Sequence, residues 1–195
     1  KSYFLNFIEK IHILQNIYLK NNYFFKKKTY SMYCEDLIVE KYFEEKFNGF
    51  YVDLGCYHPV QHNNTMLLYQ RGWRGINVDI NEFSIKLFNF CRPDDLNLNL
   101  AVSDKNGEID FYYQKKFSLL NTIKKSKADL VFQGSIKKEK ITSQTLTKIL
   151  DNSKYKDKQI DFLKIDVEGA DLDVLKSFNF SRYTPKLICI EILPS

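Results

Sequence analysis

Carboxylates follow short apolar segments at several points along this chain. They are Asp53, Asp79, Asp104, Asp166, Glu168 and Glu191. A single acid at the end of a strand usually caps a turn or a helix, but a series of such strand ends is harder to explain in that way. Carboxylates that meet repel one another and are costly to bury unpaired. The series therefore predicts a shared crevice whose ligand is cationic, donates hydroxyl hydrogen bonds or brings a metal ion.

The turn after Asp53 restricts the nucleotides that such a crevice could hold. It reads Gly55-Cys56-Tyr57-His58-Pro59, with one glycine where the dinucleotide motif G-x-G-x-x-G needs three. The phosphate-binding motif G-x-x-x-x-G-K-[ST] is also absent from the sequence. An acid at the end of the next strand, Asp79, suits a bidentate hydrogen bond to a ribose diol. These features favour an adenosine ligand without a pyrophosphate.

Two histidines and two acids are candidates for a catalytic base. His58 lies on the first turn at the crevice, and a histidine side chain titrates near pH 6.5 when unperturbed. His62 is the second candidate, and for both histidines a loop or capping role is the alternative. Asp166 and Glu168 are two residues apart, so an extended chain projects them to one side. They could bind Mg²⁺ as a Lewis acid for the substrate oxygen, or act as bases themselves.

Alternating strand and helix patterns would position these residues. Strands are predicted at 50–55, 75–79, 96–102, 107–113, 160–166 and 187–192, and helices at 3–19, 35–47, 65–71, 83–90, 145–150 and 172–178. This alternation implies β-α-β crossovers and a mainly parallel sheet. Ligands of such sheets bind beyond the carboxyl ends of the strands, where the strand order reverses. The acids are therefore expected along one edge of an α/β sheet.

Length and composition indicate one α/β domain with an N-terminal extension. A chain of 195 residues with 44% hydrophobic and 27% charged residues is typical of a globular domain and excludes intrinsic disorder. Residues 1–29 are predicted to form an amphipathic helical extension that packs on the domain or on a partner, with a membrane-surface helix as the alternative. No apolar run approaches the roughly 20 residues that cross a bilayer, and no signal peptide is evident. We expect a cytoplasmic protein that is not transmembrane.

Cysteines and lysines narrow the expected partners. Four isolated cysteines form no C-x-x-C pair, so neither a zinc site nor a disulfide framework is expected. The stretch from Tyr113 to Lys158 contains 12 lysines and 4 acids, but few aromatic residues for base stacking, so nucleic acid is not an expected partner. The stretch is either a solvated loop region or a patch that attracts an anionic substrate, such as one bearing phosphate.

Seven segments carry a family resemblance in their order and spacing. They are Cys34-Glu35-Asp36, Gly49 to Gly55, Asn64-Thr65, Arg71 to Asp79, Ala101 to Asp104 with Gly107, Ile160 to Gly169 with Asp171 and Leu175, and Glu191. Together they resemble the FkbM family of S-adenosylmethionine-dependent methyltransferases, from about Tyr30 to Ile192. Residues 30–195 are therefore expected to form an FkbM-like methyltransferase domain.

The resemblance implies a Rossmann-like class I methyltransferase sheet with helices on both faces. It also implies S-adenosylmethionine as cofactor and O-methylation of a sugar, a glycan precursor or another small hydroxylated molecule, in a surface-polysaccharide or natural-product pathway. The matching positions are Asp53 and Gly55 for the turn beside the methionine moiety, Asp79 for the acid that holds the ribose, Ser103 and Asp104 for the segment near the adenine, and Asp166 and Glu168 for the Asp-Val-Glu-Gly motif at the reacting centre.

This sequence departs from the family pattern in two places. The first turn lacks the further glycines that are usual in class I methyltransferases, and Tyr57 and Pro59 stand nearby. The fifth-strand motif lies close to the end of the sequence, so the antiparallel hairpin that normally completes the sheet is expected to be missing or to lie beyond this chain.

Two other functions stay open at this point. A nucleotide-sugar glycosyltransferase is suggested by Asp171-Leu172-Asp173 and the lysine-rich stretch. However, those two acids are expected on a helix, whereas a metal-binding D-x-D motif normally follows a strand. The other alternative is a non-catalytic module that keeps the methyltransferase fold for interactions.

Overall fold

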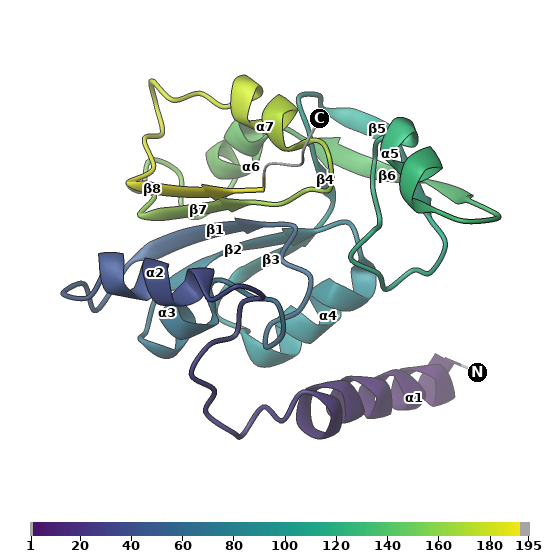
Figure 1. The fold of residues 1–195 in the computed structure, drawn as a ribbon, viewed down its shortest axis with the longest axis horizontal. Coiled ribbons are helices and arrows are strands. Elements are labelled where there is room, and N and C mark those ends of the chain that lie inside the picture. Colours follow the sequence, from purple (N-terminus) through teal and green to yellow (C-terminus); the bar gives the residue numbers. More distant parts are fainter. Residues whose placement is uncertain (1, 192–195) are drawn as a thin grey trace.

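The computed structural model describes residues 2–191, and its centre is a parallel sheet (Figure 1). Within that range, the sheet order is β3-β2-β1-β7-β8, and every neighbouring pair is parallel. The strands are β1 (Phe50–Leu54), β2 (Arg74–Asp79), β3 (Leu96–Asn99), β7 (Phe162–Ile165) and β8 (Leu187–Ile190). The order reverses between β1 and β7. This arrangement confirms the predicted Rossmann-like α/β fold with a mainly parallel sheet.

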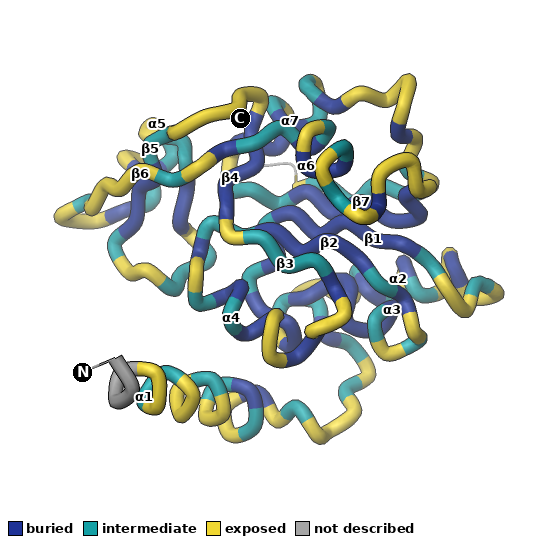
Figure 2. The backbone as a smooth tube through the Cα atoms, turned by 180° about the vertical axis from the view of Figure 1, so that it is seen from behind, coloured by how far each residue is buried: buried dark blue, intermediate teal, exposed yellow. Residues whose placement is uncertain are grey.

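The central strand β1 is buried on both faces, as parallel strands between helix layers are. Phe50, Val52 and Leu54 belong to the larger core cluster, on the side of α6 (Leu146–Asp151) and α7 (Asp171–Ser177). Tyr51 points to the other side and packs with Trp73 and Phe162. Figure 2 shows the inner strands β1, β2 and β7 mainly in the colour of buried residues.

Helices cover both faces of the sheet, as predicted. α2 (Glu35–Tyr42), α3 (Met66–Gln70) and α4 (Glu82–Cys91) lie on one side, and α6 and α7 lie on the other (Figure 1). α4 begins directly after β2 because the Asn81 side chain accepts hydrogen bonds from the backbone N–H groups of Phe83 and Ser84. Thr145 caps α6 in the same way. These caps fix where the chain turns at the edge of the sheet.

A smaller sheet lies beside the main one and corrects two predictions. It contains β4 (Ala101–Val102), β5 (Gly107–Tyr113) and β6 (Lys137–Gln144), in the order β4-β6-β5. The predicted strand 96–102 is therefore two strands in two sheets. The predicted strand 107–113 is β5, and it pairs antiparallel with β6, a strand that was not predicted. α5 (Lys125–Val131) was not predicted either.

The N-terminal extension packs on the domain. α1 (Ser2–Leu14) continues as a π-helix, Gln15–Lys20. Ile17 is buried against Leu87 and Cys91 of α4, and Glu9 forms an ion pair with Lys86 of the same helix. Between residues 2 and 191, no helix combines the length and apolar character needed to cross a bilayer. All four cysteines are free thiols.

Candidate active site

A cleft with about 550 Å³ of empty space opens at the carboxyl ends of β1, β2 and β7. This is the point where the strand order reverses, and it is where open α/β sheets bind their ligands. Strand ends supply Gly55, Tyr57, Val78, Asp79, Ile80, Leu100, Ala101, Val102, Asp166, Val167 and Glu168 to the lining, and the loop before α5 supplies Ser118, Leu119, Asn121 and Ile123. Its lining combines apolar side chains with a few polar groups, as small-molecule sites do.

Gly55 lets the first turn pass very close to β7. It adopts φ +70°, and a Cβ at this position would lie only 1.7 Å from the backbone oxygen of Asp166. The Gly55 N–H donates to the Val78 carbonyl at 2.9 Å. A glycine is therefore required here both for the backbone conformation and for the close approach, and it draws the ends of β1, β2 and β7 together.

Gly55→Ala is expected to destabilise the protein by about 2–4 kcal/mol, because left-handed backbone strain adds to the overlap with Asp166. Urea unfolding measures the loss. The matched control is Gly107→Ala, since Gly107 also has positive φ but has open space around its Cβ position. Equal losses in the two variants would show that the approach to β7 is not what requires the glycine.

Asp79 is held in the cleft by two backbone donors. Its Oδ2 accepts from Tyr57 N–H at 2.7 Å, and its Oδ1 accepts from Asn81 N–H at 2.7 Å. Burial raises the pKa of Asp79 to about 6, although both N–H groups act in the opposite direction. Each oxygen retains a further acceptor site. At neutral pH the carboxylate can therefore receive the two hydroxyl groups of a diol.

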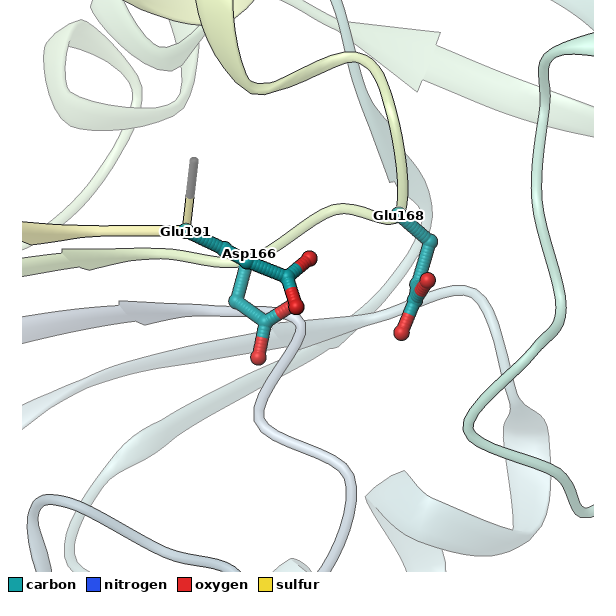
Figure 3. Close-up of side chains that lie close together, drawn as sticks. All are labelled: Asp166, Glu168 and Glu191. Carbon is teal, nitrogen blue, oxygen red and sulfur yellow. The ribbon is translucent and has the colours of Figure 1, made fainter. Parts of the chain in front are cut away.

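Three acids meet on the other side of the cleft (Figure 3). Asp166, Glu168 and Glu191 each offer one carboxylate oxygen, and these atoms lie within 4.8 Å of one another. Glu168 forms an ion pair with Lys127 of α5. Burial raises the pKa of Glu168 to about 7, opposed by Lys127 and assisted by the charges of Asp166 and Glu191. A carboxyl group with a pKa near 7 suits proton transfer at neutral pH.

Lys164 is a residue whose importance the sequence did not reveal. Its Nζ donates to the Gly55 carbonyl at 2.8 Å and to Asp166 Oδ2 at 3.1 Å, and it lies 3.7 Å from Asp53 Oδ1. Burial acts to lower the pKa of Lys164, but Asp166 and Asp53 together raise it well above its ordinary value. This fixed cation ties the first turn to the Asp166 side chain. Its only sequence signal was its place within the Ile160–Gly169 segment.

The comparison with known families agrees with this geometry. A family model described as the methyltransferase FkbM domain matches residues 53–195, which is most of the chain. The chain belongs to the FkbM methyltransferase family. A search of curated proteins and a search of solved structures gave no match. The match includes the residues that line the cleft in this FkbM methyltransferase.

The prediction that His58 is the catalytic base is wrong for this methyltransferase. Its Nδ1 accepts from the N–H groups of Val60 and Gln61, so Nε2 carries the proton and donates to Asn16 Oδ1 at 2.7 Å. The side chain is buried outside the cleft, and burial lowers its pKa to about 3. His58 is therefore a structural residue that joins the first turn to the N-terminal extension. His62 also lies outside the cleft lining.

Three predicted cofactor-binding residues lie outside the cleft lining. Asp53 is buried beside Lys164 and accepts a hydrogen bond from Thr65 Oγ1 at 3.0 Å. Ser103 Oγ lies 2.7 Å from Ser143 Oγ, and Asp104 is exposed. The residues of that segment that reach the cleft are the ones just before them, Ala101 and Val102. Asp53 is connected to the cleft only through Lys164.

Both aspartates of the D-x-D motif in this FkbM methyltransferase make contacts within the fold. Asp171 starts α7 and accepts from the N–H groups of Val167 and Gly169 at 2.8 and 3.0 Å. Asp173 forms an ion pair with Lys124. This arrangement removes the observation that suggested a glycosyltransferase.

Half of the twelve lysines in the lysine-rich stretch of this methyltransferase form ion pairs within the fold. Lys138 and Lys140 lie 2.7 and 2.8 Å from Asp110 on the neighbouring strand. Lys116 lies 3.3 Å from Glu139, and Lys127 reaches Glu168 at the cleft. Part of the positive charge in this stretch is therefore balanced locally.

Sequence reasoning also missed the wall that closes the cleft. Tyr57 adopts a left-handed conformation, φ 52°, and its ring stacks on Phe117 with centroids 5.1 Å apart. Thr122 Oγ1 donates to the Glu168 carbonyl at 2.6 Å, and Asn121 donates to the Lys116 carbonyl at 2.6 Å. These contacts hold the loop before α5 over the site. The only hint of these contacts in the residue pattern was a tyrosine where class I methyltransferases usually have glycine.

Proposed function

We propose that this chain is an S-adenosylmethionine-dependent O-methyltransferase that methylates a hydroxyl group of a sugar or glycan precursor. The main support is the position of Asp79. It follows β2 beside the switch point of the sheet, with both oxygens oriented by backbone N–H groups. An acid at this place suits a ribose diol. The cleft has no pyrophosphate-binding glycine motif, so an adenosine with a short charged tail fits it better than a dinucleotide.

The lining divides into two parts that suit the two ends of this cofactor. Val78, Leu100 and Val102 form an apolar wall on which the adenine ring would pack, and Asp79 would hold the ribose. The sulfonium end would lie toward Asp166 and Glu168, whose negative charges attract a cation. Gly55 leaves room for the methionine part beside the first turn.

Methyl transfer is an in-line displacement. The acceptor oxygen bonds to the methyl carbon while the carbon–sulfur bond breaks, its electron pair stays on sulfur, and the hydroxyl proton passes to a base. Holding the two reactants in line can supply about 7–11 kcal/mol of the barrier. The sulfonium charge disappears during the reaction, so nearby carboxylates stabilise the bound cofactor more strongly than the transition state. Their proposed role is therefore to orient the cofactor and to take up the proton.

We assign the proton acceptor to Glu168 and an orienting role to Asp166. Glu168 has a pKa of about 7 and therefore gains and loses a proton at neutral pH. Asp166 is held in place by Lys164 at 3.1 Å. The same acids could bind Mg²⁺, which prefers carboxylate oxygens. Lysines already contact Asp166 and Glu168. We therefore prefer a mechanism in which Glu168 takes up the proton over one in which a metal ion assists.

Calorimetry with S-adenosylhomocysteine tests the cofactor assignment, and titrations with and without Mg²⁺ test the metal. We expect saturable binding that Mg²⁺ does not strengthen. Assays of methyl transfer to sugars with and without phosphate groups then test the acceptor class, including the phosphate-bearing acceptor that the lysines suggested. Binding of a nucleoside diphosphate with Mn²⁺, without binding of S-adenosylhomocysteine, would instead support a glycosyltransferase. Cofactor binding without turnover would support a non-catalytic module.

The free cysteines agree with the proposed cytoplasmic location.

Cofactor affinity is expected to depend on the ionisation of Asp79. The ionised carboxylate accepts both ribose hydroxyls, so affinity for S-adenosylhomocysteine should be constant above about pH 7. Because the pKa of Asp79 is about 6, affinity should fall about tenfold between about pH 7 and about pH 5. Calorimetry across this range measures the change. Asp79→Asn should bind more weakly with little pH dependence, and a persistent fall in that variant would assign the titration to another group.

A further inference from the structure

An apolar stripe on the N-terminal extension is left uncovered by the domain. Phe7, Ile11 and Leu14 are spaced by four and three residues, so they lie on one face of α1. Phe7 is 61% exposed, and the other two are also exposed. A different face of the helix, which contains Ile13 and Ile17, packs on α4. Figure 2 shows exposed residues along the coloured part of α1, from residue 6 onward.

The π-helical turn extends this stripe. In a π-helix the backbone bonds to the fifth residue along, so Leu19 follows Leu14 on the same face. Leu19 is 75% exposed. The turn that follows presents Phe24 and Phe25, which are 78% and 71% exposed. The ring of Phe24 stacks on Tyr18 with centroids 4.7 Å apart, so it is held beside the helix. We call Phe7, Ile11, Leu14, Leu19, Phe24 and Phe25 the apolar stripe.

The same segment is one of two parts of the chain with a large positive net charge, and the other is the stretch from Tyr113 to Lys158. Residues 1–29 contain six lysines and one glutamate, a net charge of +5, which equals the net charge of the whole chain. The glutamate, Glu9, is already paired with Lys86. Lys20, Lys26 and Lys28 are exposed next to the stripe. The remaining residues, from 30 onward, are electrically balanced.

We propose that the N-terminal extension docks this protein on an anionic lipid surface. Exposed phenylalanine and leucine side chains flanked by lysines are the two features that hold an amphipathic helix in the interface of a bilayer. The apolar stripe would enter the headgroup boundary, and the lysines would contact acidic headgroups. Each lysine near such a surface strengthens binding by about fivefold.

The same charge argues against a second copy as the occupant. In a symmetric dimer, the same patch faces itself, so two segments of net charge +5 would be brought together. Like charges facing each other across an interface are unfavourable. An anionic surface would replace that repulsion with attraction to the lysines of the extension.

The docking surface and the cleft are connected through one residue, Phe117. Phe117, from the loop that closes the cleft, packs in the cluster around Ile17. The same ring stacks on Tyr57 of the cleft wall. A surface that holds the extension would therefore lie next to the loop that covers the cleft.

Vesicle sedimentation of the full chain tests the proposal, independently of any methyl transfer. The vesicles are phosphatidylcholine alone, or phosphatidylcholine with about 30% phosphatidylglycerol. Binding to the anionic vesicles should be at least about tenfold tighter, and should weaken when the salt rises from about 0.1 to about 1 M, because the screening length falls from about 10 to about 3 Å. Lys26→Gln/Lys28→Gln should weaken binding by about 20-fold.

The triple variant Phe7→Ser/Leu14→Ser/Leu19→Ser should lose at least about tenfold in binding. It should keep the thermal stability of the parent chain, because these side chains are exposed. The matched control is Leu130→Ser/Leu172→Ser, which removes exposed leucines from α5 and α7 on the opposite side of the molecule (Figure 1). Absence of vesicle binding, or equal binding by the triple variant, overturns the proposal. A dimer in light scattering that the triple variant dissociates would assign the stripe to a second copy.

Discussion

Replacement of Asp79 by alanine is expected to weaken binding of S-adenosylhomocysteine by about 10²–10⁴-fold. The carboxylate would accept two ribose hydroxyls, and hydrogen bonds to a charged group contribute about 1.5–3 kcal/mol each. Because Tyr57 N–H and Asn81 N–H already orient both oxygens at 2.7 Å, the site is formed before the ligand arrives. Calorimetry of the variant and the parent chain measures the loss.

Two further variants serve as controls for the Asp79→Ala titration. Asp79→Asn retains one acceptor and should have an intermediate affinity. Asp94→Ala removes an exposed aspartate whose ion pair with Arg74 lies at the opposite end of the sheet, and it should bind like the parent chain. Loss of Asp79 also leaves two N–H groups without their acceptor, so thermal melting must accompany the titration. An Asp79→Ala variant that melts normally and binds normally would contradict the ribose assignment and the cofactor with it.

Glu168→Gln is expected to reduce turnover by about 10²–10⁴-fold, the usual contribution of a general base. Glutamine has nearly the same shape but cannot take up the proton. Affinity for S-adenosylhomocysteine should change little, because its sulfur carries no charge and its ribose contacts are made on the other side of the cleft. A methyl-transfer assay at saturating cofactor, together with calorimetry, separates the two effects. Unchanged turnover would show that Asp166 or a metal-bound species accepts the proton instead.

Lys127→Met supplies the control for Glu168. Lys127 opposes the rise in the pKa of Glu168, so its removal should raise that pKa above about 7. The base is active when it is deprotonated, and activity should therefore fall at neutral pH and recover as the pH increases. A merely structural loss would lower activity equally at every pH. This readout distinguishes proton transfer by Glu168 from a role in holding α5.

The central sheet and half of the cleft could be predicted because parallel strands bring distant residues to one edge. Asp79, Asp166 and Glu168 follow strands whose apolar patterns are clear, and the carboxyl ends of those strands meet at the cleft. No contact between them had to be known in advance. Glu191 joined the group for the same reason, since β8 pairs with β7 in parallel.

The direction of the chain after Gly55 could not be predicted in this way. Position on the first turn suggested that His58 faces the cleft. Tyr57 instead takes a left-handed conformation, which turns the next side chain toward Asn16 of the N-terminal extension. Partners from a segment more than 40 positions earlier decided the outcome. Such long-range contacts leave no trace in local residue patterns.

The strand β6 of the second sheet was missed because it lacks the usual apolar alternation. β6 begins Lys-Lys-Glu-Lys, and its first half is exposed, so these residues pair with β5 without contributing to a core. In α5, Ala128 is the buried residue among those described. The predicted strand 96–102 is two strands because the chain leaves the main sheet at Leu100 and enters the smaller sheet at the next residue. Backbone pairing, rather than burial, determines structure in this region.

The bond between His58 and Asn16 has a consequence for the choice of recombinant fragments. A protein trimmed to begin at residue 30 would lose the acceptor of the buried imidazole N–H and uncover Leu87 and Cys91. Trimming to the matched range would cut deeper, since residue 53 lies within the central strand and Phe50 to Val52 would be lost. Shortened versions should therefore aggregate or refold poorly, whereas expression that starts at Lys1 retains both the imidazole acceptor and the middle of the sheet.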